Sequence, residues 1–336
     1  MNRKTCYDSD HVVIRELERI CKMDRVYRFS GHETFPCRYA WLPKGVGALR
    51  ENDLIFSQMD DAIVLMGLGK NMVKALRFWV TAMKVAEPKP NVRYGFQVSA
   101  FGEKIFGTKR KKGYDPYLED ISTLWLLHWQ LCSHDDEPIF AWEFLISRFQ
   151  DAEIRKSSVV PIIAREAQQL DRPLSPVTLA QHFDVFLHSY VPTRGNKSAI
   201  VEDSLDCPLT ELDLIQYIGK RESDDGKSEP AYAFRREPKP EVSPALFAYC
   251  LNDFWDRLRP NASSIPLKDI ATSVGSPGQV FKLPEDDIRE RLFAIEIDTG
   301  GYFKFSDSSM LEQVSRTEDV EVDLLDCVYH GGLVDA

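Results

Sequence analysis

The chain has 336 residues, more than one hydrophobic core usually serves, and its composition (43% apolar, 28% charged) excludes global disorder. No apolar run approaches the about 18–20 residues that span a bilayer, and no hydrophobic signal segment follows Met1, so we expect a cytoplasmic protein without membrane contact. The net charge of −10 is uneven: residues 1–112 hold 21 Lys/Arg and 12 Asp/Glu, whereas residues 113–336 hold 21 and 40. We expect a polyanion to bind the N-terminal third, although a charged half can also be only a solubilising surface.

Residues 1–112 show the element order of a winged helix-turn-helix domain that binds DNA. After a short amphipathic helix predicted at 11–22, the pattern predicts helices at 60–66 and 70–84 with a glycine turn between them. A strand-like alternation then begins at Val92 and continues to Phe106. Helix, tight turn, helix and a short β segment is the order of a winged helix.

The helix predicted at 70–84 has one apolar face and one cationic face. We predict that its polar positions bind DNA, namely Lys70, Asn71, Lys74, Arg77 and Lys84. The glycines before it do not form a P-loop, because one residue separates them instead of four and Asn71 follows Lys70 in place of Ser or Thr. We interpret them as the turn before a recognition helix, and a purely structural turn is the alternative.

Residues 28–45 form the densest cluster of chemically capable side chains. A turn shaped by Gly31 and Pro36 would let His32 and Glu33 project into a cleft as general base or metal ligands. We predict Glu33, His32 and Arg38 as catalytic residues, and we add Arg28 and Lys44 to the DNA-binding set. The alternative is that the His-Glu pair caps the following helix while the aromatic residues form core.

The seven Cys are scattered singly, which favours reduced thiols over disulfides or a zinc finger. A sulfur-carrying role for Cys37 beside Arg38 is disfavoured, because no second Cys and no flanking His is near it in the sequence.

Residues 113–193 are predicted to be an all-helical central region. Its helices are expected at about 115–132, 139–150, 158–170 and 175–190. Asp115 and Glu119 begin the first helix, where acidic residues are ordinary partners of the helix dipole. If that helix faces Glu33, the three carboxylates are candidate ligands for Mg²⁺ or Mn²⁺.

The remaining chain is predicted as a loop-rich connection at 194–240 and an acidic C-terminal domain at 241–336. In that domain we expect helices at about 244–258, 266–273 and 284–294, followed by a hairpin of 293–297 and 301–305. This order suggests a second winged-helix-like domain, whose acidic charge favours protein contact or dimerisation over DNA binding. The predicted fold class is therefore mostly α (α+β).

Four ordered motifs resemble one bacterial family, and the resemblance runs from about residue 28 to about 305. They are Phe29–Phe35, Gly67–Val73 with Arg77–Trp79, Asp115–Asp120 with Thr123–Trp129, and Asp206–Leu209. The sequence thus resembles the SspB-like family of DNA phosphorothioation systems, formerly a domain of unknown function. The resemblance implies a DNA-nicking protein that works with a cysteine desulfurase, an ATPase and an ATP pyrophosphatase. It assigns no catalytic residues, so Glu33, His32 and Arg38 rest on the motif itself.

The leading hypothesis is a DNA nickase that binds double-stranded DNA through the first winged helix and hydrolyses a phosphodiester with Mg²⁺ or Mn²⁺. Glu33, helped by His32, would bind the metal or activate water, and Arg38 would stabilise the charged phosphorane. One alternative is a non-catalytic DNA-binding adaptor that recruits the sulfur-transfer proteins, and another is a transcriptional regulator. Helix-turn-helix proteins are commonly two-fold symmetric, so a homodimer is expected.

Overall fold

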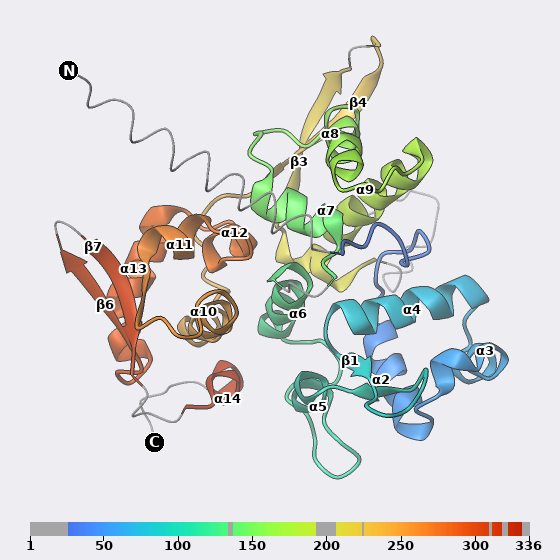
Figure 1. Cartoon of the computed structure of the whole chain (residues 1–336), viewed down its shortest axis with the longest axis horizontal. Helices are drawn as coiled ribbons and strands as arrows, with labels where there is room; N and C mark the ends of the chain where they lie inside the picture. The colour runs from blue at the N-terminus through green and yellow to red at the C-terminus, as the bar shows by residue number, and fades with distance from the viewer. Residues whose placement is uncertain are drawn as a thin grey trace.

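The computed structural model describes residues 26–133, 137–192, 206–223, 225–308, 311–317 and 322–330 (Figure 1). These residues form many helices and three small antiparallel sheets, which confirms the mostly α (α+β) class. The helix predicted at 11–22 lies outside the described residues. No helix in the described part of the chain is both long and apolar enough to cross a membrane.

The N-terminal elements pack closely around one long helix, α4 (Figure 1). In chain order they are α2 (Trp41–Glu51), the 3₁₀ turn η1 (Ile55–Ser57), α3 (Met59–Met66), α4 (Lys70–Ala82), β1 (Ala86–Pro88), β2 (Phe96–Val98) and α5 (Ala100–Phe106). Gly67 ends α3 in the left-handed region (φ 62°), which supplies the predicted turn before α4. Buried Trp79 of α4 donates a hydrogen bond to the Phe35 carbonyl (2.9 Å) and so ties the helix to the segment before α2.

The β segment of this region differs from the prediction. Strand β2 pairs antiparallel with β1, which pattern analysis did not single out, and residues 89–95 form the loop between the two strands. The predicted continuation of the strand into residues 99–106 is wrong, since this segment is the helix α5. Ser99 caps α5 by accepting a hydrogen bond from the Gly102 amide, and such local capping overrides a short apolar alternation.

The central region begins with α6 (Ile121–Ser133), which is buried along most of its length. The others are α7 (Phe140–Glu143), a π-helical turn η2 (Phe144–Arg148), α8 (Lys156–Gln169), α9 (Pro176–Tyr190) and the 3₁₀ turn η4 (Pro208–Leu212). Helix α6 begins at Ile121 rather than near residue 115, because the preceding residues form a turn. The Asp115 carboxylate accepts hydrogen bonds from the amides of Glu119 (2.9 Å) and Asp120 (3.0 Å) in that turn.

The prediction of a purely loop-rich connection at 194–240 is wrong for its second half. Strands β3 (Ile215–Glu222) and β4 (Ser228–Phe234) form an antiparallel hairpin that extends beside α8 (Figure 1). A register shift between Tyr217 and Gly219 bends β3, and Ile154 pairs with Tyr232 to join the hairpin to the central region.

The C-terminal part contains α10 (Pro244–Leu258), β5 (Ser264–Pro266), α11 (Leu267–Thr272), α12 (Pro277–Phe281), α13 (Glu285–Asp298), β6 (Phe303–Ser308), β7 (Leu311–Arg316) and α14 (Leu324–His330). The three strands form a sheet in the order β5-β7-β6. The hairpin predicted from residues 293–297 and 301–305 is wrong, because 293–297 is the last part of α13 and β6 pairs with β7. The division into four segments stays a prediction.

Candidate nucleic-acid interface

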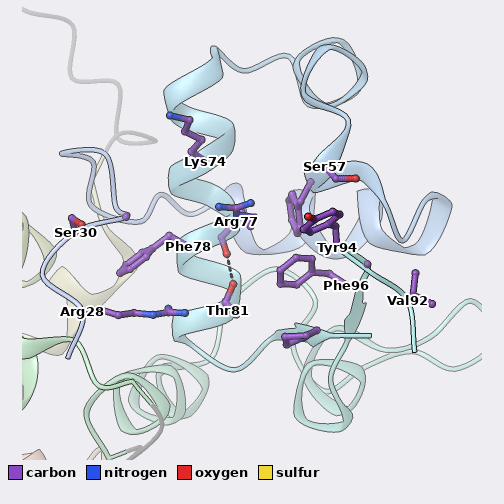
Figure 2. Close-up of a pocket in the computed structure, with 14 residues that line it drawn as sticks. Arg28, Ser30, Ser57, Lys74, Arg77, Phe78, Thr81, Val92, Tyr94 and Phe96 are labelled. Carbon is purple, nitrogen blue, oxygen red and sulfur yellow. Dashed lines mark hydrogen bonds between the residues drawn. The ribbon is translucent and has the colours of Figure 1, made fainter. Parts of the chain in front are cut away.

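A cleft of about 510 Å³ lies between the segment Arg28–Gly31, helix α4 and the β1–β2 loop (Figure 2). The cationic face of α4 forms one wall, and aromatic side chains of the loop and of β2 form the facing wall. Because the lining residues come from parts of the chain that lie apart in the sequence, the turn η1 among them, the fold itself creates the site. The cleft lies within the basic N-terminal third of the sequence.

Three cationic side chains line the cleft. Lys74 and Arg77 are one turn apart on α4, and Arg28 reaches towards the same helix near Thr81 (Figure 2). Lys74 Nζ is 3.6 Å from Glu33 Oε1, and Arg28 Nε is 3.0 Å from Glu137 Oε2. Arg77 is exposed and has no ion pair among the described residues. The structure thus brings three of the predicted DNA-binding residues to one cavity.

Aromatic residues line the same cleft, and the sequence analysis did not single them out as ligand-binding. Tyr94 is 65% exposed, Phe96 is half-buried and packs edge-on against Phe56 (5.6 Å between ring centroids), and Phe78 is buried. Arg93 lies 4.8 Å from the centroid of the Tyr94 ring. The alternation that predicted a strand over these residues was the available signal, but it did not reveal that Tyr94 sits in the loop before β2.

The Ser30–Thr34 segment turns sharply at the edge of the cleft. Gly31 has φ 112°, and a Cβ at this position would lie 2.8 Å from Phe78 Cδ2, so only glycine fits against that ring. Glu33 and Thr34 both have positive φ (50° and 66°), a conformation that costs free energy for residues with a side chain. The turn places the Glu33 carboxylate beside Lys74, which lines the cleft.

His32 does not project into a cleft, which corrects the sequence-based prediction. It is 4% exposed, its ring lies edge to edge and nearly coplanar with that of His182 (5.4 Å between centroids, 11° between planes), and His32 Nε2 lies 3.1 Å from His182 Nδ1. The Ala141 amide donates to His182 Nε2 (3.0 Å). Burial lowers the pKa of His32 to about 4, and burial together with the neighbouring His32 lowers that of His182 to about 3. Both rings are therefore neutral near pH 7 and join the turn to α7 and α9.

Arg38 is also placed differently from the catalytic role predicted for it. Its guanidinium lies over the rings of Phe35 (5.9 Å) and Trp41 (5.5 Å), and it is not among the described residues that line the cleft. Stacking on two aromatic rings holds this side chain in place. Of the described residues, none of the three predicted catalytic ones lines the cleft, although Glu33 pairs with Lys74, which does.

The other predicted DNA-binding residues surround the cleft or lie away from it. Lys70 and Asn71 are exposed in the first turn of α4. Lys84 follows α4 with φ 54° and lines a small neighbouring cavity together with Arg28. Lys44 Nζ donates to the Met66 carbonyl (2.8 Å) at the end of α3, so its charge stabilises a helix terminus.

The three predicted metal ligands do not assemble into one cluster. Across the described ranges, no group of three or more His, Cys, Asp or Glu side chains is arranged to hold a metal ion. Both Asp115 carboxylate oxygens accept backbone amides in the turn that precedes α6. Glu119 is exposed in the same turn.

Comparison with known proteins gives two kinds of match. A family model described as "Protein of unknown function (DUF4007)" matches residues 29–329. A solved structure described as "Magnesium ion-bound SspB crystal structure" is 26% identical in sequence and superposes with a TM-score of 0.78. The match covers 92% of this chain and 90% of that one. A second, "SspB crystal structure", has the same identity and coverage and a TM-score of 0.77. No curated protein sequence matches significantly.

Proposed function

The chain belongs to the DUF4007 family, and we propose that it is the DNA-binding and DNA-nicking component of a DNA phosphorothioation system. The likeness to the SspB structures over 92% of the chain supports the system. In this proposal α3, α4 and the β1–β2 hairpin act as a winged helix, with α4 as the recognition helix. The elements β5 to β7 and α11 to α13 act as a second winged-helix-like unit.

The observation that carries the proposal is the convergence of Lys74, Arg77 and Arg28 on one cleft although the whole chain is acidic. Cations gathered on an exposed helix face attract a polyanion, and each phosphate that they neutralise releases counterions. Arg77 is exposed and ready to contact a phosphate. Lys74 is paired with Glu33 over 3.6 Å, a long and half-exposed contact that a phosphate can replace at little cost.

Glu33 is the carboxylate that we propose for strand cleavage. Mg²⁺ is usually held by one or two carboxylates together with phosphate oxygens and water, so a single carboxylate beside a phosphate-binding lysine fits such an ion without a three-ligand cluster. When bound, Mg²⁺ or Mn²⁺ supplies positive charge at the scissile phosphate. Lys74 leaves Glu33 for a DNA phosphate, Arg77 orients that phosphate, and the neutral His32–His182 pair holds the turn that positions Glu33.

The test is the conversion of supercoiled plasmid to open circles by the wild type and by Glu33→Gln, with Mg²⁺, with Mn²⁺ and with chelator. Glu103→Gln, an exposed substitution on α5, is the matched control. We expect metal-dependent nicking by the wild type and the control, and DNA binding without nicking by Glu33→Gln. If Glu33→Gln still nicks DNA, the protein is a nickase but Glu33 is not its catalytic carboxylate.

A second candidate function is a DNA-binding adaptor. It is favoured by the positions of two predicted catalytic residues, because His32 is buried and Arg38 lies over Phe35 and Trp41, away from the cationic cleft. In this case the acidic C-terminal half would recruit the cysteine desulfurase, ATPase and ATP pyrophosphatase, and the chain would act as a homodimer on its site. Intact DNA binding with no nicking by any variant, with or without those partners, would favour the adaptor.

A further inference from the structure

Contact with a DNA backbone does not by itself require a cavity such as this cleft. Phosphates bind to exposed cationic faces, and such contacts need no cavity behind them. The volume of about 510 Å³ falls in the range of about 300–1,000 Å³ that is typical of small-molecule sites. The cleft is therefore large enough to take a group that projects from a DNA backbone bound at the cationic wall.

The chemistry of the two walls matches a single nucleotide. Lys74 and Arg77 offer charge to phosphates on one side, and Tyr94 with Phe96 offers aromatic surface on the other (Figure 2). Bases that leave the stack are commonly held against aromatic side chains, and this contact tolerates any base because every base has a π-face. The hydroxyl groups of Ser30 and Ser57 also line the cleft and can meet the polar edge of a base.

The loop that carries Tyr94 is fixed before any ligand arrives. The Lys89 amide donates to the Gly95 carbonyl (2.9 Å), the Gly95 amide donates to the Val92 carbonyl (3.0 Å), and Lys89 Nζ binds Asp53 Oδ2 (2.7 Å). Tyr94 itself has φ 62°, which is uncommon for an aromatic residue and is retained where surrounding contacts impose it. The ring is thereby held at the mouth of the cleft while 65% of the residue stays exposed.

We propose that the cleft receives one unstacked nucleobase against Tyr94 and Phe96 while Lys74 and Arg77 hold the adjacent phosphates. This inference rests on the proposed function and names the form of its substrate, which is DNA with a locally open or extrahelical nucleotide. Extruding a base from an intact duplex costs free energy, and a nucleotide that is already unpaired avoids that cost. The protein should therefore bind an unpaired nucleotide more tightly than a paired one.

The experiment compares binding to three duplexes of the same sequence. One is fully paired, one carries a single-nucleotide bulge, and one carries the same bulge with an abasic site. The abasic bulge keeps the backbone distortion and removes the base. We expect the wild type to bind the bulged base about tenfold more tightly than the abasic bulge, which corresponds to about 1.4 kcal/mol from stacking.

Variants of the β1–β2 loop test whether Tyr94 causes the preference for the base bulge over the abasic bulge. Tyr94→Ala should bring the ratio between base bulge and abasic bulge close to one, whereas Tyr94→Phe, which keeps the ring, should retain it. Tyr117→Ala removes another exposed tyrosine (72% exposed), one that does not line the cleft, and should also retain it. Thermal unfolding of each variant confirms that it is folded.

The possible results distinguish a failure of the base pocket from a failure of the proposed DNA binding. Binding of the paired duplex with equal affinity for base bulge and abasic bulge would overturn the base pocket and leave DNA binding intact. A preference that survives in Tyr94→Ala would also overturn it. No binding to any of the three duplexes would overturn the proposed function together with the pocket.

Discussion

Three buried histidines set the response of this protein to acid. The rings of His32 and His182 meet edge to edge next to the turn that holds Glu33, and His128 bonds the Tyr190 hydroxyl (2.8 Å) and the Val280 carbonyl (2.9 Å). Burial lowers the pKa of His32 and His128 to about 4 and that of His182 to about 3. The folded protein therefore keeps these rings neutral well below the pH at which the unfolded chain protonates them, near 6.5.

We predict that stability is lost as the pH falls from about 6.5 to about 4. In this window the unfolded state binds more protons than the folded state, so the free energy of unfolding rises with pH and falls on acidification. The urea midpoint should decrease between pH 7.5 and pH 4.5. The midpoint of His182→Gln should decrease less steeply, because this variant lacks one of the histidines that bind a proton on unfolding. His188→Gln, at an exposed position of α9, is the control. A wild-type midpoint that is constant from pH 7 to 5 would contradict this account.

Sequence patterns located the chemically dense turn but not the role of its histidine. Gly31 and Glu33 lie where the motif predicted a shaped turn, and Glu33 reaches the cationic helix. The partner of His32 is His182, 150 residues away, and no local spacing connects the two. Burial of a polar ring depends on such distant contacts, so it could not be predicted from residues 28–45 alone.

At the level of elements, local caps made some helices predictable. Ser175 caps α9 and Ser243 caps α10, each with a proline at the next position, and both serine hydroxyls accept a backbone amide. The helices expected at about 175–190 and 244–258 begin at these caps. The hairpin β3–β4 was missed because its glycines and prolines are typical of loops, while strand pairing depends on residues that lie apart in the sequence. The first β segment was misread for the same reason, since β1 and β2 are separated by a loop.

Helix α5 supports the hairpin that forms one wall of the cleft, and Gly102 is the point of closest approach. A Cβ at Gly102 would lie 2.2 Å from the Val85 carbonyl oxygen and 2.9 Å from Val98 Cγ1. We predict that Gly102→Ala lowers the free energy of unfolding by about 1–3 kcal/mol, because the helix must move away from the strand backbone.

The matched control for that prediction is Gly47→Ala in α2, where nothing lies within 4 Å of the added Cβ. There alanine should raise the free energy of unfolding by up to about 1 kcal/mol through its higher helix propensity. Urea denaturation of both variants makes the comparison. Equal stability of Gly102→Ala and wild type would show that α5 does not pack tightly on the hairpin.

Across the whole molecule, the C-terminal helix α14 connects regions that are distant in sequence. Thr123 of α6 bonds the Tyr329 hydroxyl (2.8 Å), Tyr114 stacks on Tyr329 (4.5 Å), and Lys104 of α5 pairs with Asp323. The acidic C-terminal part is thus joined to the basic N-terminal part away from the cleft. This arrangement leaves the cationic face of α4 open, although the chain as a whole repels a polyanion.

In the proposed function, the cationic face of α4 binds DNA phosphates in the cleft. If Lys74 and Arg77 each neutralise one phosphate, replacing both with alanine removes two contacts and the release of their counterions. A control variant, Lys220→Ala with Lys268→Ala, removes the same charge from exposed positions on β3 and α11. This control separates the effect of phosphate contacts made by α4 from the effect of a change in the net charge of the chain.

The most direct test is the salt dependence of binding to a short duplex, with the logarithm of the affinity plotted against the logarithm of the salt concentration. For the Lys74→Ala/Arg77→Ala variant we predict weaker binding and a slope shallower by about 1.8, near 0.9 per lost phosphate contact. The control variant should keep the slope of the wild type. A slope unchanged in the α4 variant, or lowered equally in the control, would contradict the claim.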